Sequence, residues 1–299
     1  MATSYTYKAF GLTIQSEIEL PELPIAFGAP DVTITLGNVP KTLDNPLFTG
    51  VRFVTKLNEF LLRVDRIASY YVIEGKQITV EIMPEADIAD VRLFLLGSAF
   101  AALIHQKGLL PFHGSSVNIN NSAIIFSGQS GAGKSTLAAL FYKNGFPLIS
   151  DDISVISLSK EEKPFVQPGY PQMKLWSDSI KKLGKEPSAY NTIRKQIEKR
   201  SIPITSSYQN ESLPLKNIFI IVSSNLGELK VEALKGVEKF NLLSNHTYRF
   251  NFIAGKQMQT NHFKNITAIT NHVNVMRLVR PSGKFVFDEI IGLITNSMK

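Results

Sequence analysis

The chain has 299 residues, of which 44% are hydrophobic and 19% are charged, and it contains no cysteine. This length and composition suit a globular protein with one large domain or two ordinary ones. The lack of cysteine excludes disulfides, thiolate metal sites and thiol catalysis. The formal net charge is +7, and the basic excess lies in the second half of the chain. Residues 1–150 hold 11 Lys and Arg against 12 Asp and Glu, whereas residues 151–299 hold 21 against 13.

The start of the chain and its most apolar stretch bear on where the protein acts. Residues 1–8 lack the long apolar core of a secretory signal, so we expect a cytoplasmic protein. The most apolar stretch, residues 94–104, is shorter than the about 20 residues that cross a bilayer. We therefore expect no membrane partner.

Residues 1–86 are predicted to form a small β-rich N-terminal domain. Apolar and polar residues alternate, as in half-buried strands, over residues 31–36, 60–64, 69–73 and 77–82. Residues 87–107 then predict a connecting helix that begins at the capping residue Asp87 and ends before Gly108. We place the boundary here, so that a second domain spans residues 87–299 and includes this helix.

From Leu109 the pattern becomes α/β. Two strands, residues 110–119 and 122–127, flank a turn, and a helix at 134–143 and a short strand at 146–149 follow. Residues 160–215 are polar, basic and irregular in pattern. Residues 217–223 predict an apolar strand, and residues 289–296 predict a helix.

The strongest functional signal is a glycine-rich segment between the strand 122–127 and the helix 134–143. Residues 128–135 fit G-x-x-x-x-G-K-[ST], in which loop N–H groups point at phosphate oxygens and the next helix adds its positive end. Lys134 would reach the β- and γ-phosphates of ATP, and the Ser135 hydroxyl would bind Mg²⁺. We therefore expect ATP and Mg²⁺. The residues expected at the nucleotide are Gly128, Gln129, Ser130, Gly131, Ala132, Gly133, Lys134, Ser135 and Thr136.

Asp151 and Asp152, just past the strand 146–149, form the second signal. Phosphoryl transfer needs a carboxylate to help hold Mg²⁺ and a base to orient or deprotonate the attacking hydroxyl. Considered without its context, such a pair is more often part of a turn or a helix cap. However, loops that follow strand ends commonly line the ligand sites of α/β proteins, which favours a functional role here. The strand 217–223 runs into serines where nucleotide enzymes commonly have an aspartate. The metal-binding acid must therefore come from elsewhere, and this pair is the natural candidate.

His113 lies in the strand 110–119 and is the third signal. A histidine there could donate to a phosphate or shuttle a proton near neutral pH. A lone histidine is more often structural, and both interpretations stay open on the residue alone.

A dense basic patch spans residues 181–200. Two glutamates, Glu186 and Glu198, face seven cations: Lys181, Lys182, Lys185, Arg194, Lys195, Lys199 and Arg200. Such a patch could attract an acidic peptide, nucleotide phosphates or nucleic acid, or it could be a solvated surface. No nucleic-acid module is visible and no aromatic residues interleave with the cations, so we expect no nucleic-acid partner.

Three segments together resemble the catalytic domain of HPr serine kinase/phosphorylase. They are residues 109–117 (LLPFHGSSV), 127–135 (SGQSGAGKS) and 148–153 (LISDDI). Residues 168–178 (PGYPQMKLWSD) are closer still to the HPr-kinase-like proteins encoded with ribosomal-peptide pathways, which include kinases of a serine on lasso-peptide precursors. The resemblance covers residues 109–180 well and the remainder loosely.

The resemblance implies an α/β fold with a phosphate-loop core of the HPr kinase and PEP carboxykinase type, preceded by the small β-rich domain. It implies Asp151 as the base that activates the acceptor serine. Asp152 would support the metal, together with Ser135, or the acceptor, and His113 would lie near the transferred phosphate. HPr kinases assemble as oligomers, so the resemblance admits an oligomer here.

The sequence departs from the true HPr kinases in one segment. The Glu-x-Arg-Gly-x-Gly segment that follows the aspartate pair in that family is missing. This puts phosphorolysis, and HPr itself as the substrate, in doubt. Arg249 could supply the missing cation at the γ-phosphate, or it could be a surface arginine.

These features together predict an ATP-dependent serine kinase. Its acceptor would be a peptide or small protein, such as a lasso-type precursor peptide, with the basic segment 181–200 as its clamp or lid. Two alternatives stay open: a kinase of a small hydroxylated metabolite, and a non-catalytic ATP-binding regulatory protein.

Overall fold

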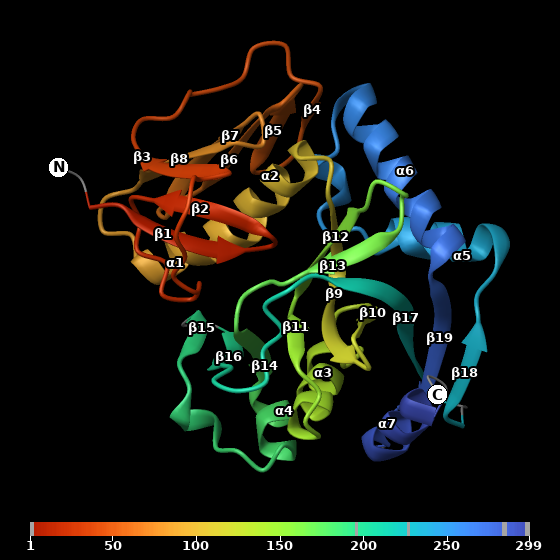
Figure 1. Cartoon of the computed structure of the whole chain (residues 1–299). Coiled ribbons are helices and arrows are strands. Elements are labelled where there is room, and N and C mark those ends of the chain that lie inside the picture. The colour runs from red at the N-terminus through yellow and green to blue at the C-terminus, as the bar shows by residue number, and fades with distance from the viewer. Residues whose placement is uncertain (1–2, 195–196, 226–227, 283–285, 297–299) are drawn as a thin grey trace. The chain divides into compact units, whose positions relative to one another are not determined.

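The structure is a computed structural model that describes residues 3–194, 197–225, 228–282 and 286–296. Two compact units are present (Figure 1). The first contains residues up to 111 together with residues 248–265. The second contains residues 112–247 and the chain from residue 266 onward.

One eight-stranded sheet forms most of the first unit. Its order is β1-β2-β3-β8-β7-β6-β5-β4, so β1 and the short β4 are its edges. The strands are β1 (Tyr5–Ala9), β2 (Leu12–Ser16), β3 (Val32–Leu36), β4 (Phe48–Thr49), β5 (Phe53–Lys56), β6 (Glu59–Val64), β7 (Ala68–Ile73) and β8 (Gln77–Ile82). The four predicted strands are confirmed. Buried residues alternate with less buried ones along β3 and β8, whereas β6 and β7 each contain three consecutive buried residues and so are buried on both faces there.

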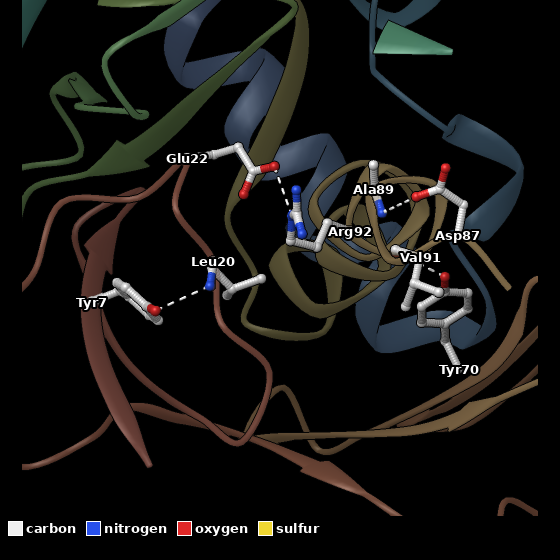
Figure 2. Close-up of polar contacts among 8 residues, drawn as sticks. All are labelled: Tyr7, Leu20, Glu22, Tyr70, Asp87, Ala89, Val91 and Arg92. Carbon is white, nitrogen blue, oxygen red and sulfur yellow. Dashed lines mark hydrogen bonds and ion pairs between the residues drawn. The ribbon is translucent and has the colours of Figure 1, made fainter. Parts of the chain in front are cut away.

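A helical segment packs on this sheet and comprises α1 (Ile88–Phe94), a π-helical turn (Leu95–Ala99) and α2 (Phe100–Gln106). Asp87 caps it as predicted, since its Oδ1 accepts the Ala89 N–H at 3.0 Å (Figure 2). The Tyr70 hydroxyl of β7 donates to the Val91 carbonyl at 2.8 Å, and Arg92 pairs with Glu22 at 2.9 Å (Figure 2). These contacts join the helix to the first unit, whereas the sequence analysis assigned it to the second domain.

The segment 88–106 is also apolar enough to cross a membrane by length and composition alone. Of its most apolar window, 61% is buried inside the protein, as in the core helix of a soluble domain. The arrangement is therefore consistent with a soluble protein.

A segment far along the chain, residues 248–265, also belongs to the first unit. It contains a 3₁₀ turn (Phe250–Phe252) and the first part of α6 (Gly255–His272). The Phe252 ring lies 4.6 Å from the Phe53 ring and 4.5 Å from the Phe60 ring, centroid to centroid. Aromatic packing thus brings residues 248–265 back to β5 and β6, which local patterns do not predict.

The main sheet of the second unit closes on itself, because an inner strand also pairs with the first strand of the order. The order is β10-β9-β12-β13-β17-β19-β18, and β10 also pairs with β17. Its strands are β9 (Leu110–Ile119), β10 (Ser122–Gly128), β11 (Leu148–Ser150, paired with β9), β12 (Ile153–Leu158), β13 (Pro164–Gln167), β17 (Leu213–Ser224), β18 (Lys230–Ala233) and β19 (Asn274–Pro281). Its helices include α3 (Lys134–Lys143), α5 (Gly236–Asn245) and α7 (Phe287–Asn296), together with the end of α6. The core includes the buried rings of Phe126, Phe141 and Phe219.

The elements predicted around the glycine-rich segment are confirmed. Strand β9 and helix α3 have the predicted bounds, β10 extends one residue further, and both residues of the predicted turn, Asn120 and Asn121, have positive φ. Strand β11 lies within two residues of its predicted position. These elements are local and strongly patterned, so sequence suffices to place them.

The expectation that residues 160–215 are irregular is wrong. This stretch contains β13 and a three-stranded sheet of order β14-β16-β15, with β14 (Gln172–Trp176), β15 (Thr192–Arg194) and β16 (Ile197–Pro203). Helix α4 (Ser177–Lys182) follows β14 (Figure 1). Met173, Leu175 and Ile202 are buried in one core with α3. These strands form because β14 pairs with β16, which lies about 25 residues further along the chain. The local sequence pattern does not record such pairing, so it fails to predict the strands.

The expectation of a mixed α/β chain with a β-rich N-terminal part is therefore confirmed. The finer expectation, a core of the HPr kinase and PEP carboxykinase type, stays a prediction.

Candidate functional site

A glycine loop, residues 128–133, joins β10 to α3. Gly128, Gly131 and Gly133 have φ values of +147°, +81° and +103°, which only glycine adopts without strain. At Gly128 there is also no room for a side chain, because a Cβ would lie 2.6 Å from the Ile221 carbonyl oxygen. The loop therefore curls tightly against β17 and delivers the chain to the first turn of α3.

Lys134 closes this loop from within. Its Nζ donates to the carbonyl oxygens of Gly128 at 2.9 Å and Gln129 at 3.1 Å. The residue is 8% exposed. Burial lowers the pKa of Lys134, and the negative charge of Asp152 partly offsets that effect. The Lys134 ammonium therefore lies at the loop, in a position to contact the phosphates of a bound nucleotide.

Asp151 is engaged on both carboxylate oxygens. Its Oδ1 accepts the Ser115 hydroxyl at 2.6 Å, and its Oδ2 accepts the Lys174 N–H at 2.7 Å. The residue is buried. Asp151 thus joins the end of β11 to β9 and β14.

Asp152 points elsewhere, because its backbone is left-handed with φ +70°. Its Oδ2 lies 3.6 Å from the Nζ of Lys174. Burial alone would raise the pKa of Asp152, but the nearby positive charges, chiefly those of Lys174 and Lys199, outweigh burial and hold the pKa below its usual value. Asp152 is therefore ionised at neutral pH.

Asp152 and the glycine loop share one cavity of about 170 Å³, here called the loop cavity. Its lining includes His113, Lys134, Ser135, Asp152, Lys174 and Lys199. Burial, followed by the charge of Lys134, lowers the pKa of His113, so its imidazole is neutral at pH 7. Three lysines and one carboxylate in so small a space create a strong field for an anion.

A second cavity of about 420 Å³ also borders the glycine loop. It is bounded by loop residues 128–132, by residues 220–223 at the end of β17, and by Leu242 and His246. Burial is the main cause that lowers the pKa of His246 to about 4. The lining is mainly apolar, which suits a flat, weakly polar group.

The structure brings together most of the residues predicted for the site. Lys134, Ser135, Thr136, Asp152 and His113 line the loop cavity together with Ser130, Gly131 and Gly133. Gly128, Gln129 and Ala132 line the cavity beside it. Asp151 lies one residue behind Asp152, and its predicted role as the base stays a prediction.

Arg249 is described within the first unit. Its guanidinium carbon lies 5.4 Å from the Tyr248 ring centroid and 5.8 Å from that of Phe252. Its predicted role at the γ-phosphate stays a prediction.

Four further residues of the site were missed by the sequence reasoning. Lys174 and Ser179 lie on β14 and α4, and Ser179 is 2.8 Å from the Thr136 hydroxyl. Lys199 lines the loop cavity from β16, but the sequence analysis placed it only within a general basic patch. Arg280 lies one residue before the end of β19 and donates from Nε to the Ala132 carbonyl at 3.1 Å. Strand alternation in residues 172–176 could have indicated Lys174, whereas no local signal indicates Arg280.

The side-chain donors in the loop cavity limit how a metal ion could be held there. Among the described residues, no group of three or more His, Asp and Glu side chains could hold a metal ion by itself. Ser135 and Asp152 line the same cavity. One hydroxyl and one carboxylate fit Mg²⁺ that takes its other ligands from phosphate and water, which is how proteins commonly hold it.

Comparison with known proteins gives similarity to solved structures alone, and the similarity described here is distant. No protein-family model matches the sequence, and no curated protein matches it. Among solved structures, the chain is similar to the HPr(Ser) kinase/phosphatase from Coxiella burnetii. The identity is 12%, the TM-score is 0.36, and the match covers 63% of this chain and 90% of that chain. A structural similarity this weak supports no conclusion about function. The function is therefore inferred from the residues of the site.

Proposed function

We propose that this protein is an ATP-dependent, HPr-kinase-like phosphotransferase that acts on a serine hydroxyl of a peptide or small protein. The observation that carries the proposal is the loop cavity, in which a glycine loop, Lys134 and an ionised Asp152 meet. Residues 168–178 resemble the HPr-kinase-like proteins encoded with ribosomal-peptide pathways, so a lasso-type precursor peptide is the first acceptor to test. The proposed place of action is the cytoplasm, without nucleic acid or membrane as a partner.

ATP would bind across the glycine loop. Its phosphates would lie at the loop N–H groups and the first turn of α3, where Lys134 exchanges the carbonyls of Gly128 and Gln129 for phosphate oxygens. The apolar cavity beside the loop, at the end of β17, is of a size for the base and part of the ribose. Lys174 and Lys199 would neutralise further phosphate charge.

Ser135 and Asp152 would hold Mg²⁺, which when bound neutralises charge on the phosphates. Asp152 would also face the incoming acceptor hydroxyl, since among the described residues lining the loop cavity it is the sole carboxylate. Because both oxygens of Asp151 are engaged, we assign the role of base, which the family resemblance gives to Asp151, to Asp152 instead: it would orient that hydroxyl and accept its proton. Asp151, with both oxygens engaged, would fix Ser115 and Lys174 around it. Neutral His113 would donate one hydrogen bond to the transferred phosphate.

The test is direct detection of transfer by mass spectrometry. The purified chain is incubated with ATP and Mg²⁺ against lasso-type precursor peptides, an HPr-type protein, free serine and other small hydroxylated metabolites. The expected result is one added phosphate on a serine of a precursor peptide. Transfer only to a free metabolite would instead support the small-molecule kinase.

Two variants make the test specific. Lys134→Ala should abolish transfer, whereas Lys160→Ala, an exposed lysine in the turn after β12, should retain it. Tight ATP binding with no transfer to any acceptor would overturn the kinase proposal and favour a nucleotide-responsive regulator. Transfer by Lys134→Ala at the rate of the unmodified protein would also contradict it.

A further inference from the structure

The first unit contains an aromatic cavity of about 530 Å³ that the proposed chemistry does not use. Its walls include the rings of Phe48, Phe53, Phe94 and Phe252. The Phe53 ring lies 5.7 Å from that of Phe48 and 4.6 Å from that of Phe252, so the wall is continuous. Gly50 makes this packing feasible, because a Cβ there would lie 2.2 Å from the Phe53 ring. A cavity of this size and lining is typical of ligand sites.

Two arginines, Arg52 and Arg249, also line the aromatic cavity. Neither guanidinium has a carboxylate partner among the described residues. Arg249 adopts a left-handed backbone at φ +55°, which is costly for a side-chain-bearing residue. Its guanidinium stacks near the rings of Tyr248 and Phe252, which fixes its orientation and leaves its N–H groups for a ligand. The walls of the cavity are therefore mainly apolar, and both of its charged lining residues are cationic.

The aromatic cavity opens beside the edge strand β4. This two-residue strand ends the sheet, and no described strand pairs with its outer side. Soluble proteins usually protect such edges with charged side chains. Here the edge carries exposed apolar residues instead: Leu47 is 54% exposed, Phe48 47% and Val51 101%. Phe48 and Val51 line the cavity and are also exposed, so apolar surface continues from the cavity along the sheet edge.

We propose that this edge and cavity, here called the β4 groove, dock an extended acidic peptide segment. The peptide would add a strand to β4, place an aromatic or large aliphatic side chain among the phenylalanines, and set a neighbouring carboxylate on Arg52 or Arg249. A small aromatic acid would fill the cavity but leave the apolar edge uncovered, so a peptide accounts for more of the surface. This inference rests on the proposed function in one respect: it takes the docked peptide to be part of the acceptor substrate.

The test measures peptide binding without ATP, so its failure is distinguishable from failure of the kinase proposal. A phage-displayed library of random short peptides is selected on the full chain, and enriched sequences are measured by isothermal titration. The expected motif is an aromatic or aliphatic residue flanked by Asp or Glu. Affinity should fall by about tenfold or more in Arg249→Glu and in Arg52→Glu, because a repulsive charge replaces each partner.

Two further variants separate the β4 groove from general charge. Lys8→Glu makes the same change of charge on β1, at the opposite edge of the sheet, and should leave the affinity within about twofold. Val51→Glu alters only a fully exposed side chain and should weaken binding without a change in melting temperature. Selection that enriches no acidic motif, or equal loss in Lys8→Glu and Arg249→Glu, would overturn the proposal.

Discussion

Asp151 holds Lys174 through the backbone: its Oδ2 accepts the Lys174 N–H at 2.7 Å, while the Lys174 ammonium lies 3.6 Å from the neighbouring Asp152. One residue of β14 is thus bonded to both members of the aspartate pair. The backbone contact fixes where β14 lies, and the side-chain contact sets the charge of the loop cavity. The two aspartates therefore differ in environment although they are adjacent in sequence.

The buried contacts of Asp151 predict a large effect on stability. Asp151→Ala leaves the Lys174 N–H and the Ser115 hydroxyl without their acceptor. We expect the free energy of unfolding to fall by about 2–4 kcal/mol, measured by urea denaturation. Asp151→Asn can still accept from the Lys174 N–H and should lose much less. An unchanged stability in Asp151→Ala would contradict the anchoring role.

Asp152→Asn should separate catalysis from stability. Asparagine tolerates the left-handed backbone at φ +70°, so we expect a melting temperature within a few degrees of the original. Loss of the carboxylate should lower kcat by about 100-fold or more, because Asn cannot accept the proton. The checks are calorimetry and phosphate transfer to the acceptor identified by mass spectrometry. Full activity in this variant, together with a dead but folded Asp151→Asn, would return the role of base to Asp151.

The glycine loop allows a matched pair of substitutions. Gly128→Ala would place a Cβ 2.6 Å from the Ile221 carbonyl oxygen, so the loop must move and nucleotide affinity should fall by about tenfold or more. Gly131→Ala meets nothing within 4 Å and carries only the strain of φ +81°, which costs about 1 kcal/mol. Binding of a fluorescent ATP analogue checks both. Equal affinity in the two variants would show that contact with β17 does not shape the loop.

The basic segment can be tested apart from the loop cavity. Lys181, Lys182 and Lys185 are exposed, whereas Lys199 lines the cavity, and Lys195 lies outside the described residues. If the exposed lysines attract an acidic acceptor, replacing all three with glutamine should raise the acceptor KM by about fivefold at low salt. The KM for ATP and kcat should stay unchanged. An unaltered acceptor KM would reject the clamp predicted for this segment.

His105 predicts acid sensitivity of the first unit. It is buried and donates a ring N–H to the Tyr248 carbonyl at 2.9 Å, and burial lowers its pKa to about 4. Between pH 6.5 and 4 the unfolded chain binds a proton that the folded chain refuses. Stability is therefore full above pH 6.5 and falls on acidification, by at most about 1.4 kcal/mol per pH unit from this group.

The measurement is urea denaturation at several pH values across that window. His105→Gln keeps a donor for the Tyr248 carbonyl and removes the titration, so its stability should depend less steeply on pH. His272→Gln, at an exposed position, should leave the slope unchanged. Identical slopes for His105→Gln and the unmodified protein would refute the assignment.

The amino-acid sequence by itself determined the local parts of the site. The glycines and lysine of residues 128–135, the strand before them and helix α3 after them were predictable, because hydrophobic period and glycine placement act over a few residues. The strand that delivers Asp151 and Asp152 and the capped helix after Asp87 were predictable for the same reason. The division of roles between the two aspartates was not, since it depends on which neighbours each carboxylate meets.

Only the tertiary structure decided those neighbours. Lys174, Lys199 and Arg280 reach the glycine loop or its cavity from strands that pair with partners far along the chain, and no local period records such pairing. The same holds for the segment 248–265, which aromatic packing against β5 and β6 returns to the first unit and which brings Arg249 to the β4 groove. Local propensity specifies where a side chain lies along an element, whereas burial and long-range pairing specify which charges surround it.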